Sequence, residues 1–205
     1  MGNNIITTEN GIVCEGITKS FGEKEVLRDF TFTFPYGSTT AVMGSSGCGK
    51  TTLIRIIAGL ETADSGTVKG VKREDIAILF QEDRLLPWLT ALKNVETVIT
   101  DKSRRGLAKE MLEALGLSGK DTELYPSELS GGMARRVSIA RALCYLEANE
   151  KSVLILDEAL RGLDKENLEK AVGIIKRYAK GKTVISVTHN RSSLEDNADY
   201  ILNME

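Results

Sequence analysis

The stretch GSSGCGKTT, from Gly44 to Thr52, decides how the rest of the chain is interpreted. It follows the apolar run 41–43 and precedes apolar residues at helical spacing, which predicts a strand, a glycine loop and a helix. Its glycines let successive backbone N–H groups turn toward phosphate oxygens, and the positive end of the following helix favours the same anions. The pattern G-x-x-x-x-G-K-[ST] therefore predicts a loop that binds the phosphates of a nucleotide.

The residues of this phosphate loop have separate expected roles. The Lys50 ammonium would contact the β- and γ-phosphates, and the Thr51 hydroxyl would bind a Mg²⁺ ion that bridges the same phosphates. The residues expected to bind the nucleotide are Gly44, Ser45, Ser46, Gly47, Cys48, Gly49, Lys50, Thr51 and Thr52.

Composition bounds the class of protein. The 205 residues, 41% hydrophobic and 27% charged, suffice for one full hydrophobic core. A formal net charge of −2 gives no reason to expect nucleic acid as a partner. Three cysteines in no paired pattern indicate a reducing cytosol rather than disulfides. No apolar run approaches the roughly 18 residues of a membrane span, and no basic leader is visible, so any membrane contact is expected through a partner.

The pattern along the chain predicts an α/β fold. Residues before 40 alternate apolar and polar side chains between glycines, as in β-hairpins, whereas the apolar runs 153–156 and 183–187 predict buried parallel strands around a helix. Between Gln81 and Cys144 the apolar spacing is helical. We expect one domain over 1–205. Its P-loop NTPase core, 1–81 and 149–205, would have a mainly parallel sheet and an N-terminal antiparallel β subdomain, with an inserted α-helical subdomain at 82–148.

Two adjacent carboxylates, Asp157 and Glu158, follow the buried run 153–156. They would lie at the carboxyl end of a strand, where ligands of open α/β sheets bind. We expect Asp157 to hold Mg²⁺ through water and Glu158 to activate or orient the attacking water as general base. The alternative is that this acidic pair only caps the next helix; a phosphate loop in the same chain favours the catalytic interpretation.

A second glycine motif, Leu129-Ser130-Gly131-Gly132, resembles the signature of ATP-binding-cassette (ABC) ATPases. The resemblance extends over nearly the whole chain, in the order aromatic residue, phosphate loop, glutamine after a strand, signature, carboxylate pair, Leu163-Asp164 and histidine. It implies ATP hydrolysis with ATP and Mg²⁺ as cofactors. It also implies two cassettes that close around two ATP, so that the signature residues Ser130, Gly131 and Gly132 contact the γ-phosphate held by the other subunit.

The resemblance assigns roles to four further residues. Gln81 would contact Mg²⁺ and the attacking water, His189 would contact the γ-phosphate, and Asp164 would lie at the nucleotide. Taken alone, Gln81 is equally typical of a solvated turn, and a lone histidine of a structural role. Phe21 would stack on adenine, the alternative being a core residue of the hairpin.

Three positions depart from the family pattern. Met133 stands where glutamine is usual, Ala159 replaces the usual proline, and Arg161-Gly162 replaces smaller residues. We expect hydrolysis to remain active and the coupling between subunits to be altered. The basic pair 135–136 is expected to form a solvated or salt-bridged helix face rather than a nucleic-acid patch.

The segment QEDRLLPWLT, residues 81–90, resembles importer ATPases for nitrate, sulfonate, taurine and related solutes, with Trp88 as the discriminating residue. An exposed apolar run there suits a groove that receives a partner helix; the alternative is a packed turn before a helix. The resemblance implies a second copy or a paralogue, transmembrane permease subunits and an extracytoplasmic solute-binding protein, at the cytoplasmic face of the membrane. Alternatives are an exporter or lipoprotein-release ATPase and a soluble cassette protein of ribosomes or DNA. The few residues after His189 are expected to add no regulatory domain.

Overall fold

Five parallel strands form the central sheet, in the order β5-β6-β7-β3-β8. They are β3 (Thr39–Gly44), β5 (Ile76–Leu79), β6 (Val153–Asp157), β7 (Thr183–Val187) and β8 (Tyr200–Met204). Every residue of β6 and β7 is buried, as expected for parallel strands covered on both faces. Because the strands are parallel, their carboxyl ends share one edge, which brings together the residues after β3, β5 and β6. The computed structural model describes residues 10–150, 152–188 and 198–204.

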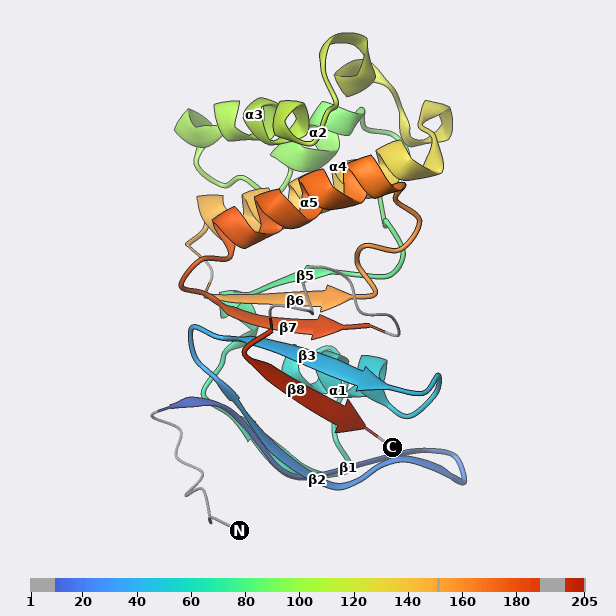
Figure 1. The fold of residues 1–205 in the computed structure, drawn as a ribbon, viewed down its shortest axis with the longest axis vertical. Coiled ribbons are helices and arrows are strands. Elements are labelled where there is room, and N and C mark those ends of the chain that lie inside the picture. Colours follow the sequence, from blue (N-terminus) through green and yellow to red (C-terminus); the bar gives the residue numbers. More distant parts are fainter. Residues whose placement is uncertain (1–9, 151, 189–197, 205) are drawn as a thin grey trace.

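A second, antiparallel sheet lies at the other end of the molecule from the helices α2 and α3 (Figure 1). Its strands are β1 (Gly11–Phe21), β2 (Lys24–Pro35) and β4 (Ser65–Lys69), in the order β2-β1-β4. Helix α1 (Lys50–Ile57) packs between the two sheets, and its buried residues share one apolar cluster with Ile12, Ile17 and Phe34. The predicted antiparallel β subdomain is confirmed, with β4 as a third strand contributed from beyond the phosphate loop.

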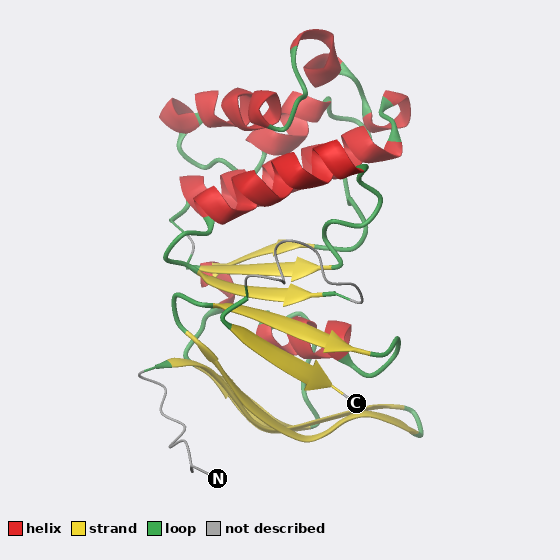
Figure 2. Ribbon diagram, viewed as in Figure 1, coloured by secondary structure: helices red, strands yellow, loops and turns green. Residues whose placement is uncertain are grey.

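Helices cover the β5-β6 side of the central sheet (Figure 2). They are α2 (Ala91–Glu96), α3 (Gly106–Ala114), α4 (Gly131–Ala148) and α5 (Lys165–Tyr178), with short 3-10 turns at Arg73–Asp75, Lys102–Arg104, Gly119–Glu123 and Pro126–Glu128. Among the described residues, no helix combines the length and the apolar character that crossing a bilayer requires. The predicted α/β fold with a parallel sheet and inserted helices is confirmed.

Helix α4 differs from the single apolar stripe that the spacing 133, 137, 140, 144 predicts. Its buried residues also include Ile139, Leu143 and Leu146, which lie on other faces. The reason is its position: α4 contacts α2 and α3 on one side and β5 and α5 on the other. A helix enclosed on several sides loses the amphipathic pattern of a surface helix.

Candidate nucleotide site

The phosphate loop connects β3 to α1, and several of its glycines, two of them within the turn itself, have backbone angles that only glycine adopts without strain. Gly47 has φ +81° and Gly49 has φ +101°. A Cβ on Gly49 would lie 2.8 Å from the Val26 carbonyl oxygen of β2. The loop therefore depends on glycine both for its backbone angles and for its close approach to the antiparallel sheet.

Lys50 places a positive charge at the centre of this loop. Its side chain is 5% exposed, and Nζ donates to the carbonyl oxygens of Gly44 at 2.9 Å and Ser45 at 2.7 Å. An ammonium removed from water needs such oxygens. Phosphate oxygens would bind the same group more strongly, because both partners would then be charged.

Thr51 and Asp157 meet at the carboxyl edge of the sheet. The Thr51 hydroxyl donates to Oδ1 of Asp157 at 3.3 Å, and Asp157 is 4% exposed. Burial raises the pKa of the Asp157 carboxyl, the Thr51 hydrogen bond lowers it, and the charge of Glu158 raises it again. Hydroxyl and carboxylate oxygens are ligands that Mg²⁺ prefers. The described residues contain no group of three His, Cys, Asp or Glu that could hold a metal.

Lys50, Thr51 and part of the phosphate loop line one cavity of about 380 Å³, whereas Asp157 lies outside the residues that line it. The cavity brings together the phosphate loop, the hairpin, the segment after β5 and the loop after β6. Phe21 is 50% exposed at this cavity, with the Lys19 ammonium 5.2 Å from its ring centroid, so the alternative of a hairpin core residue is wrong. The lining residues are Phe21, Val26, Ser46, Gly47, Gly49, Lys50, Thr51, Thr52, Gln81, Glu158 and Arg161.

The loop after β6 is sharply curled at Glu158. This residue has φ +46°, and its N–H donates to the Val187 carbonyl at the end of β7 at 2.9 Å. The Arg161 guanidinium lies 3.6 Å from Oε2 of Glu158. Both residues line the cavity. Capping of the next helix is performed by Asp164, whose carboxylate accepts the Asn167 N–H at 3.0 Å. The capping alternative for Asp157 and Glu158 is therefore wrong.

The signature residues lie elsewhere. The Ser130 hydroxyl caps α4 by accepting the Met133 N–H at 3.2 Å. Gly131 and Gly132 have ordinary helical backbone angles, and a Cβ on either would meet no described atom within 4 Å. Of the described residues that line the nucleotide cavity, none belongs to the signature. The predicted contact of these residues with a nucleotide stays a prediction.

Comparison with known proteins identifies the family. Residues 27–161 match the family model described as ABC transporter. The aliphatic sulfonates import ATP-binding protein SsuB 2 of Xanthomonas axonopodis pv. citri is 37% identical, over 97% of this chain and 69% of the relative. SsuB of Zymomonas mobilis is 39% identical, over 92% and 80%. The chain belongs to the ABC transporter family. It is an ABC ATPase that binds ATP with Mg²⁺ and hydrolyses it.

Solved ABC cassettes share the fold of this ABC ATPase. The ATP-binding cassette MJ0796, a dimer in a post-hydrolysis state bound to ADP and Pi, is 30% identical with a TM-score of 0.82, covering 95% of this chain and 94% of that one. An ATP binding subunit of an ABC transporter has a TM-score of 0.83 at 22% identity, covering 95% and 86%, and supports the fold alone.

Gln81, Asp164 and His189 complete the predicted site of this ABC ATPase. Gln81 is exposed beyond the end of β5 and lines the cavity. Asp164 lies outside the residues that line it, and the Asn167 N–H and side chain lower the pKa of its carboxyl. His189 lies outside the described residues. Their roles at the nucleotide stay predictions.

The basic pair 135–136 is not a solvated face. Arg135 is 4% exposed and forms an ion pair with Asp83 at 3.1 Å, so the salt-bridged alternative holds and the solvated one is wrong. It also donates to backbone carbonyls of the loops after β5 and β6. Arg136 is half-buried and donates to the carbonyls of Leu115 and Gly116. Sequence reasoning missed Arg135, because an arginine in a helix is typically exposed.

Trp88 is 69% exposed and Pro87 beside it is exposed as well, whereas Leu85 and Leu86 are half-buried. The buried Asn94 side chain holds this turn by accepting the Leu86 N–H at 2.7 Å and donating to the carbonyls of Leu86, Leu89 and Thr90. Thr90 caps α2. The two interpretations, a packed turn and an exposed apolar run, thus each apply to a part of this segment. The backbone of the turn before α2 is held by Asn94, whereas the Trp88 side chain is exposed.

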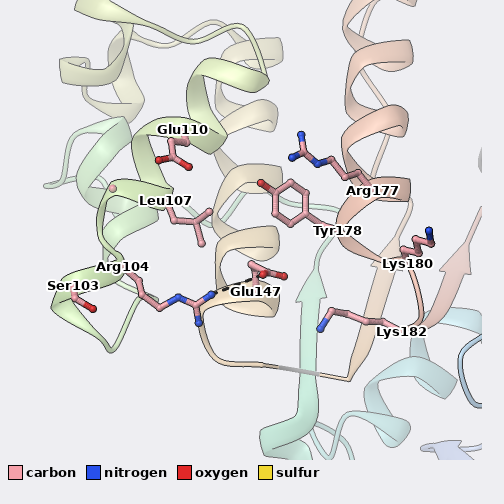
Figure 3. A pocket seen from close by; sticks show the side chains of 10 residues that line it. Ser103, Arg104, Leu107, Glu110, Glu147, Arg177, Tyr178, Lys180 and Lys182 are labelled. Atoms are coloured by element: carbon pink, nitrogen blue, oxygen red, sulfur yellow. Dashed lines mark ion pairs between the residues drawn. The ribbon is translucent and has the colours of Figure 1, made fainter.

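A larger cavity of about 590 Å³ lies between α3, α4 and α5 (Figure 3). Basic side chains surround it, and Arg104 forms an ion pair with Glu147 at 3.8 Å. Leu107 and Tyr178 face one another across it (Figure 3). None of the described residues predicted to bind nucleotide lines this cavity.

Proposed function

We propose that this chain is the ATPase subunit of a membrane importer for small organic sulfonates or closely related anions. The observation that carries the proposal is its similarity to proteins named as aliphatic sulfonates import ATP-binding proteins, which reaches 39% identity and spans nearly the whole chain. Taurine or nitrate would be variants of the same solute class. The solute itself would be selected by an extracytoplasmic solute-binding protein and by permease subunits.

The cavity supports the following division of labour in hydrolysis. The phosphate loop and Lys50 bind the β- and γ-phosphates, and Phe21 stacks on adenine. Thr51, Asp157 and Gln81 would hold Mg²⁺, and the bound ion would offset negative charge on the phosphates. Glu158 orients the attacking water and accepts its proton. His189 contacts the γ-phosphate.

The exposed signature supports a pair of chains closed around two ATP. Ser130, Gly131 and Gly132 of one copy would contact the γ-phosphate in the cavity of the other. The N-terminal end of the 18-residue helix α4 adds favourable electrostatics toward that anion. ATP would shift the population toward the closed pair, and hydrolysis would release it.

We assign residues 82–148 to a helical signature subdomain, and 1–81 and 149–205 to the nucleotide-binding core.

The exposed Trp88 supports a contact between this helical subdomain and a permease. The chain would lie peripherally at the cytoplasmic face of the membrane. An aromatic side chain at a turn held by Asn94 offers a rigid anchor for a partner helix, as interface hot spots do.

The proposal is tested by affinity purification of the tagged chain from detergent-solubilised membranes of its native cell, followed by transport assays. We expect a multi-span permease to co-purify, and proteoliposomes of the complex to take up radiolabelled ethanesulfonate with ATP but not with a Lys50→Ala chain. Trp88→Ala should weaken co-purification, whereas Tyr200→Ala, an exposed aromatic on β8, should not. Recovery with ribosomal proteins, or with a permease that does not move sulfonates inward, would contradict the proposal.

A further inference from the structure

We infer that Arg135 is a positioning residue that links the signature end of α4 to this chain's own catalytic loops. Through it, contact of the signature with a second copy's ATP would alter the placement of Gln81 and Glu158 in the same chain. The inference rests on the proposed pair of chains around two ATP and adds to it a physical connection between the two sites.

The contacts of the Arg135 guanidinium reach both loops at once. Nη1 donates to the carbonyl oxygens of Phe80 at 2.8 Å and Gln81 at 3.2 Å. Nε donates to the Ala159 carbonyl at 2.6 Å, and Nη2 to that of Glu158 at 3.4 Å. One rigid, planar group therefore contacts the backbone of both Gln81 and Glu158. Both of these residues line the nucleotide cavity.

Burial makes this connection stiff. Arg135 is 4% exposed, and its charge is balanced by Asp83 at 3.1 Å. A buried guanidinium that loses these oxygens is left without partners, at high cost in free energy. The loops and the helix are thus expected to move together rather than to slide past one another.

Helix α4 connects Arg135 to the signature. Arg135 lies five residues after Ser130, so little more than one helical turn separates the guanidinium from the signature. Further along α4, Arg141 donates to the carbonyls of Asp83 and Arg84, both at 2.8 Å. Two arginines of one helix thus hold the segment that begins with Gln81. A small shift of the signature end is transmitted to Gln81 and Glu158 by direct contact.

A matched control lies next to it in the sequence. Arg136 has the same side chain on the same helix and also donates to backbone carbonyls. Its acceptors are Leu115 and Gly116 of the helical region and Gly132 of the signature, and none of them belongs to the loops after β5 and β6. Substitution at 136 removes an arginine from α4 without touching the proposed connection.

The experiment measures ATPase rate against ATP concentration for the full chain in its permease complex. With two coupled sites the wild-type curve should be sigmoidal, with a Hill coefficient approaching about 2. Arg135→Gln should lower the Hill coefficient to about 1 and kcat by about tenfold to a hundredfold, since misplaced catalytic groups lose rate steeply. Binding of a fluorescent ADP to the isolated chain should change by less than about twofold. Arg136→Gln should keep the sigmoidal curve.

Intermediate variants guard against loss of folding. Arg135→Lys keeps a charge beside Asp83 but lacks the planar fork, so its Hill coefficient should fall between those of wild type and Arg135→Gln. A wild-type Hill coefficient in Arg135→Gln or Arg135→Lys would overturn the inference, as would an equal loss in Arg136→Gln. A hyperbolic curve from a wild-type chain that pairs and hydrolyses ATP would overturn it too. A wild-type chain that does not pair contradicts the proposed function instead.

Discussion

The two glycine motifs of this chain use glycine for opposite reasons. In the phosphate loop, Gly47 and Gly49 have backbone angles that other residues rarely adopt, and the space around Gly49 is filled by β2. In the signature, Gly131 and Gly132 have helical angles, and no described atom lies near their missing side chains. The first motif is required by the chain's own fold, and the second is not.

This difference explains what each motif can do alone. The phosphate loop forms a cavity with Phe21, Gln81 and Glu158 of the same chain. Glycines at the start of a helix reduce its stability relative to alanine, so the signature weakens α4 without any visible gain within one molecule. Its open surface and bare backbone instead suit close approach of a phosphate held by another copy. Substitutions at the two motifs should therefore change the free energy of unfolding in opposite directions.

The largest change in the free energy of unfolding is expected from a substitution in the phosphate loop. Gly49→Ala forces a φ near +101° on a residue with a side chain and places its Cβ 2.8 Å from the Val26 carbonyl. We expect the free energy of unfolding to fall by roughly 1–3 kcal/mol, the usual cost of such strain, and nucleotide binding to be lost. Urea unfolding and titration with fluorescent ATP measure both. A variant as stable as wild type would show that the loop does not need glycine here.

Substitution of Asp157, the carboxylate beside the phosphate loop, is expected to raise the free energy of unfolding, whereas Gly49→Ala lowers it. The pKa of Asp157 is raised by burial, so the folded state binds a proton more readily than the unfolded state. The ligand-free chain therefore loses stability as the pH rises from the unfolded to the folded pKa of this carboxyl. Asp157→Asn keeps an oxygen for the Thr51 hydroxyl and should raise stability by about 1 kcal/mol.

The same variant should lose Mg²⁺-dependent hydrolysis, because the amide is a weaker ligand than the carboxylate. Thermal unfolding at pH 7 and at pH 4 gives the check. The difference between Asp157→Asn and wild type should shrink at the lower pH, because a larger fraction of the wild-type carboxyl is then protonated. A gain in stability that does not depend on pH would contradict this explanation.

The sequence predicts what local chemistry dictates. The phosphate loop and the buried parallel strands β6 and β7 follow from residues close in the chain and agree with the structure. Burial of Arg135 could not be predicted in this way, because it depends on Gln81 and Ala159, which are 54 and 24 positions away from Arg135 in the sequence. The several-sided burial of α4 has the same origin in tertiary packing.

A smaller gain in stability is expected at the signature. Gly132→Ala should raise the free energy of unfolding by roughly 0.5 kcal/mol, since it restores a better helix former where nothing obstructs a Cβ. ATPase activity of the complex should nevertheless fall by about tenfold or more, because the added methyl group separates the signature from the nucleotide of the second copy. Binding of ADP to the single chain should not change.

A third helical glycine supplies the control. Gly173 lies on the exposed face of α5, and a Cβ there also meets no described atom within 4 Å. Gly173→Ala should therefore be stabilised like Gly132→Ala but keep wild-type activity. ATP-dependent pairing in a Glu158→Gln background, followed by size-exclusion chromatography, separates the two variants. Equal pairing of both would show that the signature glycines are not needed for close approach.

The smallest change in stability is expected from Arg161→Gly, a substitution toward the family pattern. The Arg161 side chain is 75% exposed, so its ion pair with Glu158 is screened by water and its loss should leave the unfolding transition nearly unchanged. The guanidinium nevertheless lines the nucleotide cavity and adds positive charge near the expected phosphates. We expect its removal to raise the KM for ATP by about threefold, with kcat within about twofold. Arg161→Lys should restore most of the wild-type KM at low salt, because the effect depends on charge. A lower kcat at unchanged KM would instead mean that Arg161 acts by orienting Glu158.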